Sequence, residues 1–254
     1  MNYLVLMELR RSGAQMRRYP VETLLSFAIL AGMFFGISYG AHATFGGVPA
    51  NQLASVLLLS YLGWMLCMNL VSGAAAELET EAMQGTIEQV FTGGVPVTRI
   101  LVARMLAGTI VTAGIVAVVA LLVGSFTGAR LGATECALLG LACVTAAGGG
   151  FALAGVSLLL KRSRSLVLLV TFGLMPVMMS SAPADWVRRS EFALWIPFVG
   201  PLGLAKASLQ HGHVPGAGEV GIATVAALLY LGMGLLAFRA LRMRAMRRGT
   251  IGHY

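Results

Sequence analysis

Charged side chains are scarce in this sequence. Only 11% of its 254 residues are charged, 57% are hydrophobic, and the mean hydropathy is +0.83. Because a soluble domain of this size carries about 25% charged residues, most of the surface must face lipid. The net charge of +8 falls in clusters between apolar runs, a pattern that sets membrane orientation and argues against nucleic-acid binding.

Residues that enzymes and ion-coupled transporters need are also few. Asp185 is the only aspartate, which excludes an intramembrane aspartyl pair, and neither an HExxH helix nor a GxSxG elbow occurs. His211 and His213 form a two-residue metal motif on a glycine-rich loop, a pattern more typical of a solvated turn. The apolar runs hold almost no ionisable side chains away from their ends. Ion-coupled transporters usually need such side chains at membrane depth, so coupling to an ion gradient is not expected.

Cysteine and lysine are rare as well. Cys67, Cys136 and Cys143 lie inside apolar runs without the spacing of metal ligands, so we expect no disulfide framework and no metal site. Neither Lys161 nor Lys206 follows a glycine, which excludes the phosphate-binding loop GxxxxGK[ST]. We therefore expect no catalytic residue and no cofactor in this chain, and we predict that it is not an enzyme.

The sequence contains several long apolar runs. Each run is long enough, or nearly long enough, to cross a bilayer as a helix. The sequence predicts one all-α integral membrane domain over residues 1–254, with six spans at about 23–41, 53–76, 100–127, 136–160, 166–182 and 220–238. Ala28, Gly32, Gly36 and Gly40 form a small-residue stripe in the first span that permits close helix contact. Three consecutive glycines, 148–150, predict a flexible point in the fourth.

Two further segments are predicted to lie at the membrane surface. In residues 1–20, apolar and arginine side chains occupy different helical faces, as in an amphipathic interfacial helix; a poorly ordered basic leader is the alternative. In residues 183–219, an apolar piece is interrupted by Pro197 and Pro201, which predicts short helices that re-enter one leaflet. Arginines and lysines concentrate on the side that holds both termini and the 77–99 connector, so this side is predicted to be cytoplasmic.

The connector between the second and third spans is unusually acidic and patterned. It contains Glu77, Glu79, Glu81 and Glu88. Residues 81–91 suit a helix of about three turns, with glycines 93 and 94 as its stop. Ile87, Val90 and Phe91 share one apolar edge, which either docks a partner protein or packs on the chain's own span ends.

The connector also carries a recognisable motif. Glu81, Gly85, Thr86, Ile87 and Glu88 read E-x-x-x-G-T-I-E, and residues 96–99 read P-V-T-R. This pattern resembles the signature of type-2 ATP-binding-cassette exporter permeases. In that family the segment follows the second of six spans and forms a coupling helix that fits a groove on the ATPase subunit. The glycine-rich turn TGGVPVT departs from the family pattern.

The resemblance implies an exporter subunit in a bacterial cytoplasmic (inner) membrane, with both termini in the cytoplasm. Two copies of a separate ATPase subunit would bind ATP and Mg and drive a permease dimer, most simply a homodimer, by alternating access. The residues that would couple to the ATPase are Glu81, Gly85, Thr86, Ile87, Glu88, Val90, Phe91, Pro96 and Arg99.

The resemblance also places the substrate path between the second and fifth spans of the two copies. Candidate lining residues are Met65, Met68, Asn69, Phe172, Met175 and Met179, although each also suits packing or lipid contact. Their pliable apolar character favours a hydrophobic or amphipathic cargo, either drug-like or lipid-like. A lipid-linked polysaccharide exporter and a non-transporting sensor or assembly protein are the alternatives, and the identity of the cargo stays open.

Overall fold

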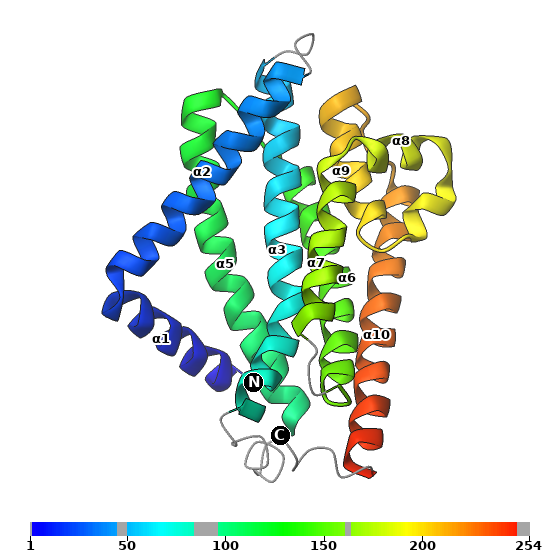
Figure 1. The fold of residues 1–254 in the computed structure, drawn as a ribbon. Coiled ribbons are helices and arrows are strands. Elements are labelled where there is room, and N and C mark those ends of the chain that lie inside the picture. The colour runs from blue at the N-terminus through cyan, green and yellow to red at the C-terminus, as the bar shows by residue number, and fades with distance from the viewer. Residues whose placement is uncertain (1, 45–49, 84–95, 161–163, 248–254) are drawn as a thin grey trace.

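The computed structural model describes residues 2–44, 50–83, 96–160 and 164–247 (Figure 1). Every regular element in these ranges is a helix, which confirms the predicted all-α class. The long helices are α1 (Asn2–Arg18), α2 (Pro20–Thr44), α3 (Ala50–Met83), α5 (Val97–Thr127), α6 (Ala133–Ser157), α7 (Arg164–Met179) and α10 (Ala217–Arg247). The shorter ones are α8 (Ala182–Arg189), the 3₁₀ helix η1 (Glu191–Trp195) and α9 (Val199–His211).

Five of these helices, α2, α3, α5, α6 and α10, are long and apolar enough to cross a membrane. Helices α7 and α8 make a sixth crossing if the pair, bent by 70°, is counted as one span. The second span differs from its predicted bounds, because α3 continues without a break to Met83 and includes the first three connector glutamates. The fifth is shorter than predicted, since α7 ends at Met179 and the chain turns there into α8.

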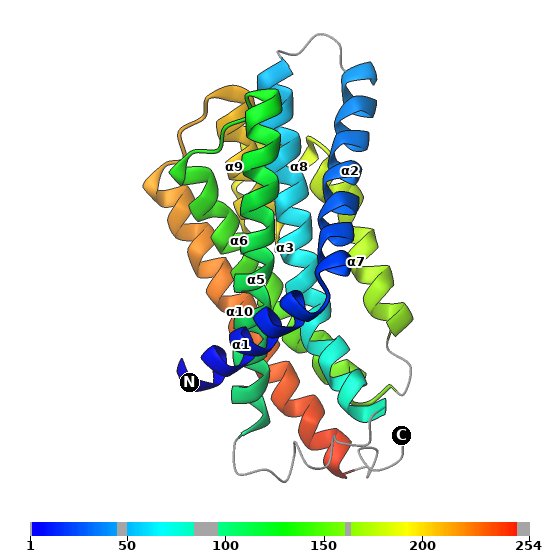
Figure 2. The same ribbon diagram turned by 90° about the vertical axis from the view of Figure 1, so that its left-hand side faces the viewer.

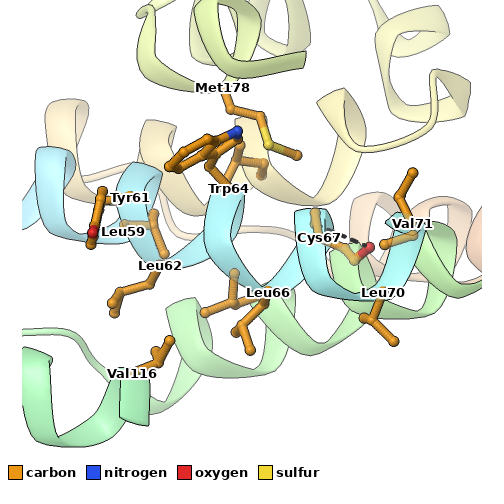
Figure 3. Close-up of a cluster of buried hydrophobic side chains, with 14 of the residues drawn as sticks. Leu59, Tyr61, Leu62, Trp64, Leu66, Cys67, Leu70, Val71, Val116 and Met178 are labelled. Carbon is orange, nitrogen blue, oxygen red and sulfur yellow. Dashed lines mark hydrogen bonds between the residues drawn. The ribbon is translucent and has the colours of Figure 1, made fainter. Parts of the chain in front are cut away.

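Helix α3 is the centre of the bundle. Its apolar stretch is 83% buried, against 12% for α2 and 22% for α5 and α10, and it packs against α5, α6, α7 and α9. Figure 3 shows buried side chains along it, among them Tyr61, Trp64 and Leu70. A helix this apolar on all sides is typical of one enclosed by other helices.

Helix α6 fits between α3 and α10 because its glycines let the backbones approach. A Cβ at Gly150 would lie 2.2 Å from the Leu70 carbonyl oxygen of α3, and one at Gly148 would lie 2.4 Å from the Tyr230 carbonyl oxygen of α10. From the other side, a Cβ at Gly234 would lie 2.0 Å from the Gly148 carbonyl oxygen. The three glycines predicted to form a flexible point lie inside a continuous helix, and Gly148 and Gly150 make close contacts with the backbones of neighbouring helices.

Helix α2 lies on the outside of the bundle (Figure 2). Its contacts with α3 include Phe34, which is fully buried and packs edge-on against Tyr61, and the Tyr61 hydroxyl, which donates to the Leu30 carbonyl oxygen at 2.8 Å. The small-residue stripe is exposed, and a Cβ at Gly32, Gly36 or Gly40 would meet no atom of the described chain within 4 Å. The exposed faces of Ala28, Gly32 and Gly36 are compatible with contact by a helix from outside the chain or by lipid.

Gly234→Ala should destabilise the fold, because the added methyl group must push α10 away from the Gly148 backbone. Overpacking of this kind costs about 1–3 kcal/mol, so the thermal unfolding temperature of the detergent-solubilised protein should fall. Gly232→Ala is the matched control on the same helix: its Cβ meets no atom within 4 Å, and alanine is the better helix former. Equal unfolding temperatures for the two variants would contradict the close α6–α10 contact.

Candidate functional site

The candidate site is the end of the bundle where α3 ends, α5 begins and α1 crosses beside them (Figure 2); we call it the connector end. Residues 84–95 fall outside the described residues. Most of the predicted 81–91 helix is among them, including Gly85, Thr86, Ile87, Glu88, Val90 and Phe91. The site is therefore built from the residues at the two edges of the connector and from the helices that hold them.

At the incoming edge, Glu77 and Glu81 lie four residues apart on one face of α3. The predicted start of the connector helix at Glu81 thus falls inside α3, which runs for 34 residues, or about 51 Å at 1.5 Å per residue. That length exceeds the roughly 30 Å hydrocarbon core of a bilayer, so α3 is longer than a single crossing requires.

At the outgoing edge, Pro96 precedes the first residue of α5 and has an extended backbone (φ −56°, ψ 126°). Its carbonyl oxygen accepts the first turn's hydrogen bond from the Arg99 backbone N–H at 2.8 Å. Val97 is buried beneath this turn, whereas the Arg99 side chain is exposed. Proline disfavours a helical conformation in the residue before it, which suits a helix that starts at this position.

The two edges are joined by Arg104, a residue that the sequence analysis did not single out. Its guanidinium Nη1 donates to Glu77 Oε2 at 3.1 Å and to Glu81 Oε1 at 2.8 Å, both on α3. Its Nε donates to Glu8 Oε1 on α1 at 3.2 Å. One side chain of α5 therefore ties together three helices from separate parts of the chain; we call this group the Arg104 node.

The node is partly shielded from water, since the side chains of Arg104 and Glu81 are each only 16% exposed. Exposed ion pairs contribute little to stability, but a guanidinium bonded to several carboxylates is held in one geometry and binds more strongly. Arg11 lies on the next turn of α1, with its Nη1 3.7 Å from Glu8 Oε2, and adds a second positive charge. Helix α1 is thus fixed to the edges of the connector by charge.

The predicted substrate-path residues lie on two packed helices. On α3, Met65, Met68 and Asn69 are half-buried, and the Asn69 side chain lies close to Gly108 of α5. On α7, Met175 and Met179 are half-buried, and Phe172 is 50% exposed. The two groups belong to helices that pack against each other, and their role as a substrate path stays a prediction.

Helices α3 and α7 contact each other around Trp64. Trp64 is buried there, and its indole N–H donates to the Thr171 carbonyl oxygen at 3.4 Å. The Met178 side chain lies against the same tryptophan (Figure 3), and the Phe172 ring is 6.3 Å from it, centroid to centroid. Trp64 is thus the residue that joins the two helices of the proposed path.

A separate polar pocket of about 380 Å³ lies at the other end of the bundle, where α3 begins and α5 ends. It is lined by Asn51, Gln52, Ser55, Gly128, Arg130 and Leu209, none of which the sequence analysis selected. Gln52 donates to the carbonyl oxygens of Leu209 and Gln210 at 3.0 and 2.9 Å, which ties the start of α3 to the end of α9.

The histidine motif is divided between different surroundings. His211 is exposed at the end of α9, and His213 Nε2 lies 3.0 Å from Glu219 Oε2 at the start of α10. Across the described residues, no group of three or more His, Cys, Asp or Glu side chains is arranged to hold a metal ion.

Comparison of the chain with protein-family models finds no match, and comparisons with curated proteins and with solved structures find none either. The family resemblance therefore rests on the connector motif and the order of the apolar segments.

Removing the charge of Arg104 should release α1. Arg104→Gln leaves three carboxylates close together without their shared cation, at a cost of about 1–3 kcal/mol for the lost charged hydrogen bonds. Amide hydrogen exchange of residues 2–18 should then rise. Arg99→Gln removes an exposed charge five residues earlier on the same helix and should leave this exchange unchanged; a rise of similar size in both variants would contradict the node.

Proposed function

We propose that this protein is the permease subunit of an ATP-driven exporter, driven by a separate ATPase subunit that docks on the 84–95 connector. In this proposal the connector end faces the cytoplasm, and the cargo is hydrophobic or amphipathic. ATP and Mg bind to the partner and not to this chain. Two permease chains, driven by two ATPase subunits, would alternate between inward-open and outward-open arrangements.

The observation that carries the proposal is the Arg104 node at the base of the connector. A partner that pushes on residues 84–95 acts on Glu81 at one edge and on Pro96 at the other. Since Arg104 bonds Glu77, Glu81 and Glu8 together, α1, α3 and α5 would move as one unit. An ion-paired node transmits a displacement that three separately mobile helix ends would absorb.

The position of α3 adds to this support. It is the central helix of the bundle, and its half-buried Met65, Met68 and Asn69 lie on the same face, at i, i+3 and i+4. A shift of α3 at the connector end would therefore be passed along the helix to the residues proposed to line the path. Methionine and phenylalanine side chains adapt to cargoes of different shape, which suits a hydrophobic substrate.

A dimer is proposed because one membrane helix lies mostly exposed on the outside of the bundle. Helix α2 is 12% buried, and the exposed stripe of Ala28, Gly32, Gly36 and Gly40 permits close contact between helix backbones. A second permease chain, identical or related, would also supply the other wall of the path.

The first test is purification of the tagged full-length chain from a membrane extract of its own source cells. We expect an ATPase subunit to co-purify and the complex to hydrolyse ATP. A membrane extract in which the intact chain never carries an ATP-hydrolysing partner would exclude the exporter proposal and leave the sensor or assembly alternative.

The second test changes the proposed contact edge. Glu88→Lys combined with Phe91→Ala reverses a charge and removes the largest apolar side chain of the motif, so it should abolish cargo-stimulated ATPase activity while expression stays normal. Glu191→Lys is the control, because it reverses an exposed carboxylate on η1, far along the chain from the connector. Full activity in the double variant would refute the assignment of the connector as the docking segment.

A further inference from the structure

A buried lysine side chain contacts the corner between α7 and α8. Helix α7 ends at Met179, α8 begins at Ala182, and the two axes differ by 70°. Helix α8 then packs against α9, and a Cβ at Gly203 of α9 would lie only 2.5 Å from the Pro183 carbonyl oxygen. We call α8, η1 and α9 together the outer hairpin; it lies at the end of the bundle where α3 begins (Figure 1).

Lys206 lies on α9, outside the candidate spans, and is 0% exposed. Its Nζ donates to the carbonyl oxygens of Met178 and Ser180, the second at 2.8 Å. Both acceptors belong to the last turn of α7 and the corner that follows. The side chain therefore crosses from α9 to the point where the chain bends.

The charged and titratable groups on the helices around Lys206 leave it without a counter-ion. No carboxylate in the described ranges lies within 4.0 Å of Nζ. Glu135 of α6 accepts from Ser208 at 2.7 Å, and Glu219 of α10 pairs with His213. The other charged and titratable residues on these helices are Arg164 of α7, Asp185, Arg188 and Arg189 of α8, Glu191 of η1, His211 of α9, Tyr230, Arg239, Arg242, Arg244 and Arg247 of α10, Cys136 and Cys143 of α6, and Tyr61, Cys67, Glu77, Glu79 and Glu81 of α3.

The number of acceptors fits the neutral form of the side chain. A neutral lysine amine has two N–H groups, and the structure offers two carbonyl oxygens. An ammonium has three donors, so one would face the interior unpaired and the charge would stay uncompensated, which is costly. The carbonyl end of α7 offsets part of this cost. Burial lowers the pKa of Lys206 to about 7.

We infer that Lys206 is a proton-operated clasp: its neutral amine holds the outer hairpin against the α7–α8 corner, and its protonation loosens the hairpin. The direction follows from linkage. With the hairpin open, Lys206 reaches water and has an ordinary pKa of about 10.4, so the open state binds more protons than the closed one. Closing is therefore favoured as pH rises from about 7 to about 10, and below pH 7 the balance no longer changes.

This clasp would make the outer end of the protein respond to pH between about 7 and 10. Leu209, on the turn of α9 after Lys206, lines the polar pocket, and Gln52 ties that turn to α3. Movement of α9 would therefore change the pocket. The clasp is independent of the proposed ATPase partner, because its residues all lie at the end opposite the connector.

The test is amide hydrogen exchange of the full-length chain in lipid nanodiscs between pH 6 and pH 9. The measured exchange rate of the amides in residues 180–195 is divided by the rate for unprotected amides at the same pH, which gives the extent of hairpin opening. We expect opening to be constant up to pH 7 and then to fall by up to about tenfold per pH unit. A flat profile would overturn the inference without any variant being made.

Variants assign the titration to this side chain. Lys206→Met should remove the pH dependence, and Lys206→Arg, which stays charged, should keep the hairpin as open at pH 9 as the unmodified chain is at pH 6. Arg189→Met removes an exposed cation on α8 and should keep the original profile. A slope that persists in Lys206→Met would overturn the inference, because another group would then be titrating.

Discussion

The close approach of backbones at Gly148, Gly150 and Gly234 is the constraint on which the rest of the bundle depends. Because these residues have no side chain, α6 lies against both α3 and α10, and α3 becomes enclosed. Water does not compete for contacts inside a membrane, so van der Waals packing of this kind supplies much of the helix association. With α3 held at the centre, its two ends become the fixed points to which the connector and the outer hairpin are attached.

The coarse fold could be predicted from the sequence, because apolar runs of sufficient length have few alternatives to a helix in lipid. The positions where helices end were harder to predict from the sequence. Glu77, Glu79 and Glu81 read as the start of a connector, yet they continue α3, since glutamate is a good helix former and nothing before Met83 interrupts the hydrogen bonding. Similarly, the glycine triplet looked flexible in isolation. Its role depends on Leu70 and Tyr230, which are distant in the sequence and carry no signal of the contact.

The candidate site could be predicted only in part. The motif from Glu81 to Glu88 is local in sequence and visible there, but the Arg104 node joins residues as far apart as Glu8 and Arg104. One signal was available: Glu77 and Glu81 share a helix face, and Arg104 is the one cation inside the apolar run that follows. Lys206 gave no such signal. Its sequence neighbours are apolar, and only the bend at Ser180 explains why a lysine is placed among them.

Arg104 and Lys206 act in opposite ways at the two ends of the bundle. Arg104 meets three carboxylates, keeps its charge at every physiological pH and joins α1, α3 and α5 permanently. Lys206 meets two carbonyl oxygens and no carboxylate, so its charge is compensated only in part and its contact depends on its proton. Arginine at the connector end is suited to transmitting a push, because a node that released at some pH would uncouple the helices. Lysine at the outer end is suited to release, because an amine can lose its charge whereas a guanidinium cannot. The difference between a guanidinium and an amine therefore explains why the Arg104 node is independent of pH whereas the proposed Lys206 contact depends on it.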